Sequence, residues 1–299
     1  MANTGGMIVG LLSQVDTISQ DFVFQGYQNL VSAYSPAIHG LIALSIIIYG
    51  YAALQGWVNF SFAETSKRLL TIGFVLALAL NWGTFSSYVY DLFTKVPNEV
   101  SSHLIQSIPG THFSNSESVT DALQDAWLSG YGFAAALWSL GGLHSIAPYL
   151  WGTAVLVIVV VVVGFALIEL VVAKFGVAIF LVLAPLIIPM VLFKATKEVV
   201  FDGWLKHLVS FAFIPVFVVS ALTLGLSLLS SSILDMKNTI SSDSLTITTI
   251  APYIIYSIVC FGLLYKAAHM AASMASGFST GSSSALKDIL KKLLPKKWK

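Results

Sequence analysis

The sequence predicts an all-α, polytopic helical membrane protein with five spans, a broken re-entrant segment, an amphipathic N-terminal helix and a helical external loop. Two observations predict this class. Of the 299 residues, 57% are apolar and only 10% are charged, whereas an average soluble domain carries about 25% charged residues. The apolar residues also gather into runs of about 20, the length at which one helix crosses the hydrocarbon core of a bilayer.

Residues 1–35 are predicted to form an external amphipathic helix. Apolar side chains recur at helical spacing from Ile8 to Tyr34, with Asp16, Asp21 and several Gln between them, which makes the segment too polar to span. It also lacks the Lys and Arg of helices that bind anionic lipid surfaces. Its apolar face therefore contacts a partner protein, a second copy of the chain, or the rest of the same chain.

Residues 36–92 are predicted to form spans 1 and 2. Pro36 begins the first apolar run and Trp57 ends it, and Trp is enriched at the interface between membrane and water. The second run carries Asn81 within it. An Asn in the middle of a span usually hydrogen-bonds to a neighbouring helix, so we expect Asn81 to hold two spans together.

Residues 93–147 are predicted to form the external helical loop, which is acidic and polar. Ser118 and Asp121 have the spacing of an N-terminal cap, so they mark the start of a helix. This helix suits contact with another protein, or with the membrane edge, because aromatic residues are enriched in both places. The aromatic side chains that would form this external partner surface are Trp127, Tyr131 and Trp138.

Residues 148–276 form the predicted membrane core, and its central feature is a broken segment over residues 175–193. The apolar run that contains this segment is too long for one span and barely long enough for two. Pro185 and Pro189 would each remove a helical hydrogen bond. Such backbone is tolerated at membrane depth only where it is buried in protein or lines a watery cavity, so we expect the segment to re-enter rather than cross.

Glu169 and Lys174 are the only charged residues between Pro148 and Phe193. Intramembrane ionisable groups usually face the interior of a helix bundle or a watery path, so Glu169 is a candidate functional residue. The alternative is a carboxylate at the end of a helix, in the interface. Lys174 either pairs loosely with Glu169 or extends to the cytoplasmic surface.

The distribution of positive charge orients the chain, because cytoplasmic segments of membrane proteins carry an excess of Lys and Arg. Six of the 15 Lys and Arg residues lie in the last thirteen residues, which makes residues 277–299 a basic cytoplasmic tail. If residues 175–193 re-enter, Lys67 and Arg68 lie on the same side as this tail, and the N-terminus is periplasmic. If the segment crosses instead, there are six spans and the tail is outside.

Catalytic and metal-binding motifs are missing from the sequence. No pair of the six His has the spacing of HExxH, and there is no GxSxG, no Gly-rich phosphate loop and no CxxC. Cys260 is the single cysteine and lies in an apolar run. The sequence therefore predicts no enzyme activity, no cofactor and no metal site.

The run LVLAPLIIPMVLFKATKEVVFDGWLKHLVSFAFIPVFVVSAL, from Leu181 to Leu222, resembles the signature of the TrbL family. These are the polytopic inner-membrane (VirB-type) channel subunits of type IV secretion systems. The family shows an apolar run, a Phe, a short basic turn, and then Phe and Trp before another apolar span. In this chain the structural motif comprises Phe193, Lys194, Lys197, Phe201, Asp202 and Trp204. The family often has Pro and Arg in the turn, where this chain has Ala195 and Lys.

The resemblance implies a multi-pass protein of the bacterial inner membrane that helps form the translocation channel for conjugation, DNA transfer or protein secretion, and supports pilus biogenesis. It implies a homo-oligomer, a ring of five copies (pentamer). The implied partners are the pilin, the minor tip pilin, bitopic scaffold subunits, ATPases and membrane lipids, with nucleic acid only as a passing substrate. Two alternatives stay open: a purely structural scaffold, and a small-molecule membrane transporter or channel, for which broken helices are typical.

Overall fold

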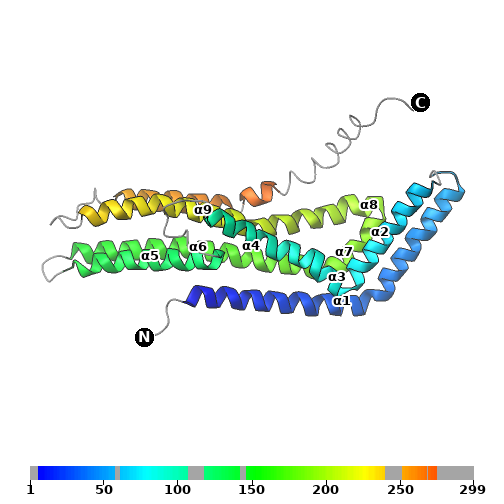
Figure 1. The fold of residues 1–299 in the computed structure, drawn as a ribbon, viewed down its shortest axis with the longest axis horizontal. Helices are drawn as coiled ribbons and strands as arrows, with labels where there is room; N and C mark the ends of the chain where they lie inside the picture. The colour runs from blue at the N-terminus through cyan, green and yellow to red at the C-terminus, as the bar shows by residue number, and fades with distance from the viewer. Residues whose placement is uncertain are drawn as a thin grey trace, which may run out of the picture. The chain divides into compact units, whose positions relative to one another are not determined.

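The computed structural model describes residues 6–57, 61–106, 118–141, 146–239, 251–267 and 269–274, and within these ranges the chain is helical almost throughout and contains no strand. In chain order the elements are α1 (Met7–Leu54), α2 (Phe62–Leu80), α3 (Trp82–Phe85), the π-helix η2 (Ser86–Tyr90), α4 (Asp91–Gln106), α5 (Val119–Ser139), α6 (Ala147–Val182), α7 (Ala184–Ile187), the 3-10 helix η3 (Ile188–Leu192), α8 (Lys194–Thr196), the π-helix η4 (Lys197–Phe201) and α9 (Asp202–Thr239) (Figure 1). A last helix covers Ala251–Met274. The predicted basic tail, residues 277–299, lies outside the described residues.

The predicted class, an all-α polytopic membrane protein, is confirmed. Among the described residues, four helices are long and apolar enough to cross a membrane, and a bent pair of helices provides a fifth candidate. Each falls where a span was predicted. The four helices are Met7–Leu54, Ala147–Val182, Lys194–Gly225 and Ala251–Met274, and the bent pair is Phe62–Leu80 with Trp82–Gln106.

A single helix, α1, covers both the predicted external helix and the predicted first span. Pro36 lies inside it and does not begin a new helix. At a rise of about 1.5 Å per residue, its 48 residues extend about 72 Å, more than twice the thickness of a hydrocarbon core. Part of its apolar face contacts the rest of the chain, because Leu12, Val23 and Tyr27 are buried, whereas Phe22 is 50% exposed.

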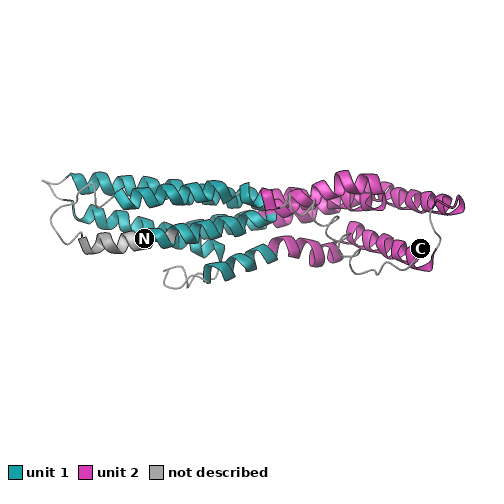
Figure 2. Ribbon diagram, turned by 90° about the horizontal axis from the view of Figure 1, so that it is seen from above, with its two compact units in different colours: residues 1–17, 95–174, 212–271 teal, residues 18–94, 175–211, 272–299 magenta. Residues whose placement is uncertain are grey.

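The chain divides into two compact units, which Figure 2 shows in different colours. Both α6 and α9 contribute residues to each unit. Unit 1 consists of residues 1–17, 95–174 and 212–271, and unit 2 of residues 18–94, 175–211 and 272–299.

Close contacts between helices hold unit 1 together. Gly130 of α5 lies so near α6 that a Cβ at this position would meet Val159 Cγ2 at 2.5 Å. The rings of Phe133 and Tyr253 pack 5.3 Å apart and join α5 to the last helix. Small residues that let backbones approach are typical of helix packing in membranes.

Candidate functional site

Residues 183–201 connect α6 to α9 through four short helical pieces, and this connection is the broken segment of the sequence. It begins later than predicted, because α6 continues through the first part of residues 175–193 and ends at Val182. No residue between 175 and 182 lacks a backbone N–H. Pro185 is the first to lack one, and Pro also disfavours helical backbone in the residue before it.

Pro185 and Pro189 are both buried, and each lies in the first turn of a short helix, α7 or η3. Pro is favoured at this position because the first N–H groups of a helix have no partner within it. The two Pro of α7 and η3 are therefore covered by protein, which is the condition under which such backbone is tolerated in a membrane protein.

The helices α6 and α9 run antiparallel where they meet this connection. The rings of Phe180 and His207 stack 5.8 Å apart, and Gly176 lies against the ring of Phe211. A residue farther back in α6 therefore contacts a residue farther along α9. The chain enters and leaves residues 183–201 at the same end of this helix pair. The connection is a turn between two candidate spans and is not a span of its own.

Trp204 joins the start of α9 to the end of α6. Its indole Nε1–H donates to the Phe180 carbonyl oxygen at 2.8 Å, and the side chain is only 6% exposed. The last four carbonyls of a helix have no donor within it, and α6 ends at Val182, so Trp204 satisfies one of them. The ring of Phe201, another residue of the motif, packs 5.7 Å from it.

Thr196 satisfies further carbonyls within the connection. Its Oγ1 lies 2.7 Å from Met190 O and 3.1 Å from Phe193 O, and shares its hydroxyl hydrogen between them. Phe193 itself is half-buried and has extended backbone, with φ −112° and ψ 124°, which separates η3 from α8. Sequence reasoning placed Thr196 in the motif region but assigned it no role.

The predicted second span is also broken, at Asn81, and the expected hydrogen bond from Asn81 to another helix is wrong. Asn81 has extended backbone, and its Oδ1 accepts the Thr84 N–H at 3.1 Å. The helices before and after it, Phe62–Leu80 and Trp82–Gln106, differ in direction by 97°. Asn is a preferred N-cap because its side chain competes for backbone N–H groups, so here it ends one helix and begins the next.

Tyr27 of α1 supports this second break. Its hydroxyl donates at 2.8 Å to the carbonyl of Leu78, one of the last four carbonyls of α2. The Tyr27 ring is 1% exposed and lies 5.2 Å from Trp82 and 4.7 Å from Phe85. The Asn-Trp-Gly run in an apolar span is a local signal for this cluster, whereas its partner Tyr27 has no such signal.

The two breaks contact each other in unit 2, because α2 packs against both α7 and η3 (Figure 1). We call this region the helix-break junction. It comprises the ends of α2 and α6 with α3, α7 and η3, and the two side chains that bond to free carbonyls, Tyr27 and Trp204. At each break, an aromatic donor from another helix satisfies a carbonyl that the break leaves free.

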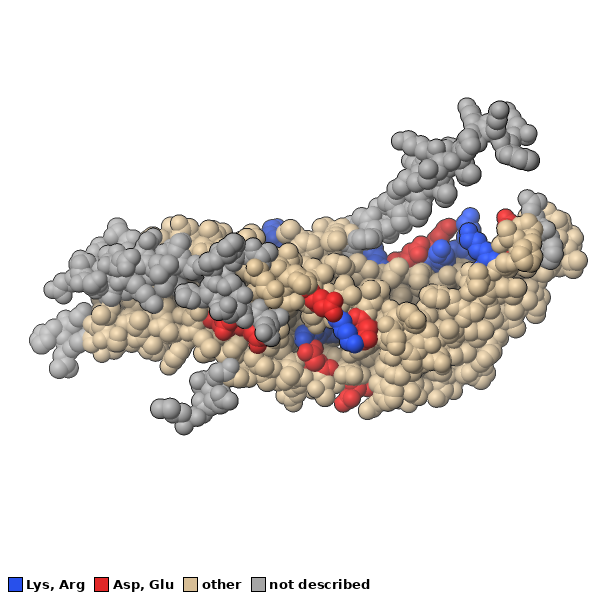
Figure 3. Space-filling model, viewed as in Figure 1, with Lys and Arg blue, Asp and Glu red and all other residues tan. Residues whose placement is uncertain are grey.

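Charged residues of the motif lie beside the helix-break junction. Lys194 and Lys197 are exposed, whereas Asp202 and Lys206 are half-buried. Figure 3 shows Lys and Arg together with acidic side chains on the face of unit 2 near α8. The connection therefore presents positive charge at the surface and keeps its two Pro inside.

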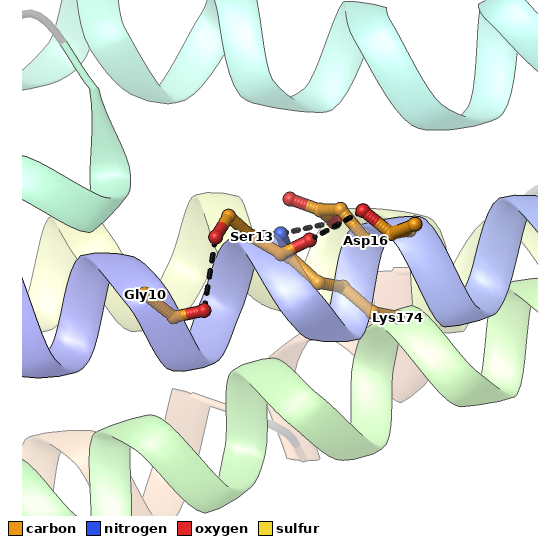
Figure 4. Close-up of polar contacts among 5 residues, drawn as sticks. Gly10, Ser13, Asp16 and Lys174 are labelled. Carbon is orange, nitrogen blue, oxygen red and sulfur yellow. Dashed lines mark hydrogen bonds and ion pairs between the residues drawn. The ribbon is translucent and has the colours of Figure 1, made fainter.

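Lys174 pairs with Asp16 of α1 and not with Glu169. Its Nζ forms an ion pair at 2.5 Å with Asp16 Oδ1 of α1 (Figure 4). Glu169 and Lys174 are five residues apart, about 140° around a helix, whereas facing side chains are three or four residues apart. The predicted external position of Asp16 and the predicted cytoplasmic position of Lys174 exclude each other, because the pair places both at one level of unit 1.

The helix that was predicted to begin at Ser118, within residues 93–147, is α5, and its predicted N-terminal cap is confirmed. Ser118 Oγ accepts the Asp121 N–H at 3.1 Å. Trp127 and Tyr131 stack with their ring centres 6.3 Å apart, and Tyr131 is 47% exposed. Trp138 lies against Gly152 of α6. Trp127 and Trp138 are both half-buried, so Tyr131 is the exposed member of the predicted partner surface.

Comparisons with known proteins give the family. A model described as TrbL/VirB6 plasmid conjugal transfer protein matches residues 42–267. The chain is 28% identical to the type IV secretion system protein VirB6 of Bartonella quintana over 192 residues, which is 64% of this chain and 57% of that protein. The VirB6 protein of Bartonella henselae is 27% identical over the same shares.

An uncharacterised protein of Rickettsia prowazekii is 25% identical over 219 residues, 70% of this chain. The chain spans about a quarter of that relative, which is matched over 24% of its length. The family match covers three quarters of the chain, includes both breaks of the helix-break junction, and leaves a small-molecule transporter without support. The chain belongs to the TrbL/VirB6 family of plasmid conjugal transfer proteins.

Proposed function

We propose that the chain is an inner-membrane subunit of a type IV secretion system that helps form the translocation channel and supports pilus assembly. The observation that carries this proposal is the family match over residues 42–267, together with relatives named as VirB6 proteins of such systems. The role is non-enzymatic. Several candidate spans are consistent with a part that lies within the membrane and shapes a passage.

In this proposal the chain assembles as a ring of five copies, and the helix-break junction narrows the inner mouth of the passage. Two features support the assignment. Pro185 and Pro189 are buried within the chain, which holds the first half of the connection in place in each copy. Lys194 and Lys197 are exposed on the same connection, and a ring of such side chains would contact a passing polymer mainly through its negative charges, as with phosphates of DNA.

The proposed orientation places the N-terminus in the periplasm and the tail in the cytoplasm. The positive charges that orient the chain are those of the connection, including Lys194 and Lys197, and those of the tail. We leave Lys174 out of this count because Asp16 neutralises it. Residues 183–201 then face the cytoplasm, where α6 ends and α9 begins.

The proposed partners are the pilin, the minor tip pilin, bitopic scaffold subunits and ATPases of the same system. The external helix α5 offers the surface for one of them through Trp127 and Tyr131, whose rings stack on an exposed part of the helix. A photoactivatable crosslinker at Ser129, which is exposed between them, should capture another subunit. Capture of the same chain alone would assign this surface to contacts between copies.

The function is tested by deleting the host's own copy of the gene and restoring it in tagged form. Deletion should abolish transfer or secretion, and the tagged protein should purify together with the other subunits. Secretion that continues without the chain, with loss of uptake of a small solute instead, would overturn the proposal in favour of a transporter.

The orientation is tested by a single Cys at Ala195, which is exposed and makes no side-chain hydrogen bond. Cys260, the single cysteine of the chain, is replaced by Ala so that only the new thiol can react. Ala is chosen because the side chain at this position is buried against Gly225. A membrane-impermeant thiol reagent should label Ala195→Cys only after the cytoplasmic face has been opened. Labelling in intact cells would place the connection outside and overturn the proposed inner mouth.

A further inference from the structure

Three buried polar atoms without a hydrogen-bond partner lie together where α1 faces α2. Of the four such atoms among the described residues, these are Tyr49 Oη, Thr65 Oγ1 and Arg68 Nε. The Arg68 guanidinium carbon lies 4.5 Å from the centre of the Tyr49 ring. Thr65 precedes Arg68 by three residues on α2, so the two side chains share one face of the helix.

Arg68 connects the two helices by a hydrogen bond that uses only some of its N–H donors. Its Nη2 donates at 3.1 Å to the carbonyl of Ser45 on α1, and Ser45 is fully buried. A guanidinium carries five N–H donors and no acceptor. The Nε–H therefore still needs an acceptor, and the two neighbouring hydroxyl groups can each donate to one as well.

The part of the chain that the structure describes supplies no anionic partner for Arg68. The ion pair of Lys174 and Asp16 lies in the other unit. Glu64 lies one turn before Arg68 on α2, but its side chain is exposed and makes no ion pair with it. Lys67, next to Arg68 in the sequence, is also exposed, so this region carries two positive charges and three unsatisfied polar atoms with no anionic partner among the described residues.

The surroundings of this cluster indicate which acceptor is missing. Large apolar side chains around it are exposed, namely Leu44, Ile48, Leu69 and Leu70. In a membrane protein such side chains face lipid tails, and Trp57, which is 74% exposed at the end of the same run, suits the interface. An acceptor with oxygen atoms and negative charge at the edge of the hydrocarbon is a phospholipid phosphate.

We propose that Arg68, the Thr65 and Tyr49 hydroxyls and Lys67 form a binding site for the phosphate of an anionic phospholipid between α1 and α2. The guanidinium fork suits phosphate oxygens. The exposed Lys67 favours a head group with a net negative charge over a zwitterionic one. This site is separate from the helix-break junction and does not depend on what the protein translocates.

The proposal is tested by thermal unfolding of the full-length protein in detergent, with phosphatidylglycerol or phosphatidylcholine of the same acyl chains added at fixed ionic strength. Phosphatidylglycerol should raise Tm several degrees more than phosphatidylcholine. Arg68→Gln should remove this difference, whereas Lys266→Gln, at an exposed Lys on the last helix, should keep it. A difference that survives Arg68→Gln overturns the proposal.

Two shape-preserving variants keep the test decisive if Arg68→Gln does not fold. Thr65→Val and Tyr49→Phe each remove a hydroxyl that has no partner in the protein. Each should leave Tm unchanged or higher without lipid, and should reduce the gain from phosphatidylglycerol. A Tm that falls equally with and without the lipid would mean that the hydroxyls are satisfied within the chain, and would overturn the site.

Two further arms distinguish other acceptors from a lipid. Inorganic phosphate at the same concentration should not reproduce the gain in Tm, and an equal gain would replace the lipid by a free anion. Glu64→Gln should leave the lipid-free Tm unchanged. If it lowers Tm as much as Arg68→Gln does, Glu64 is the acceptor for Arg68 and no lipid is needed.

Discussion

Replacing Trp204 by Phe should destabilise the helix-break junction by removing one hydrogen bond while keeping an aromatic ring in place. The hydrogen bond from Trp204 Nε1 to Phe180 O is 2.8 Å long, and Trp204 is only 6% exposed. Without it, the Phe180 carbonyl, one of the last four of α6, loses its donor at a part-buried position. The two spans α6 and α9 then lose the bond that joins them at their shared turn.

The expected cost is about 2 kcal/mol of unfolding free energy. Leaving a buried acceptor unsatisfied costs about 1–3 kcal/mol in proteins generally, whereas side-chain hydrogen bonds in membrane proteins average about 0.6 and reach about 1.7 kcal/mol. The Phe180 carbonyl is part-buried at a helix end, so we place the loss of this hydrogen bond near about 1 kcal/mol, between these two ranges. The cavity left by the smaller ring adds about 1 kcal/mol.

The assay is reversible unfolding in mixed micelles, followed by a native gel that measures assembly of the complex. Trp57→Phe is the matched control, because Trp57 is 74% exposed and its replacement should change stability by less than about 0.5 kcal/mol. The larger change Trp204→Ala should also lower the yield of assembled complex. Equal stability of the two Phe variants, or normal assembly of Trp204→Ala, would refute the role given to this residue.

Three further changes test the other contacts. Tyr27→Phe should cost about 1 kcal/mol, because it removes the donor to the Leu78 carbonyl and keeps the ring; no change in the unfolding curve would count against that bond. Asn81→Ala should cost about 1 kcal/mol through loss of the cap, and Asn81→Asp, which still caps, is its control. A double-mutant cycle of Asp16→Asn and Lys174→Met should show coupling of about 0.5–1 kcal/mol, and additive effects would mean that the ion pair contributes nothing.

The motif around the connection could be predicted from the sequence, but the contacts that each of its residues makes could not. Phe193, Trp204 and the Pro pair stand out because Pro cannot continue a helix and Trp is rare, and both signals are local. The acceptor of the Trp204 hydrogen bond lies 24 residues earlier, at Phe180. No local sequence pattern identifies the Phe180 carbonyl as the acceptor, because every residue has a carbonyl. This one lacks a helical donor only because α6 ends nearby.

The sequence by itself determined the class of the protein, the number of candidate spans and the presence of a broken connection, because hydropathy over about 20 residues and the positions of Pro depend only on the chain. Only the tertiary structure decided which side chains that are distant in the sequence form hydrogen bonds and ion pairs. Tyr27 of α1 satisfies the Leu78 carbonyl beside the break at Asn81, and Lys174 pairs with Asp16, 158 residues away. A residue five positions along a helix faces another direction, so the ion-pair partner of Lys174 lies on the helix that packs against α6.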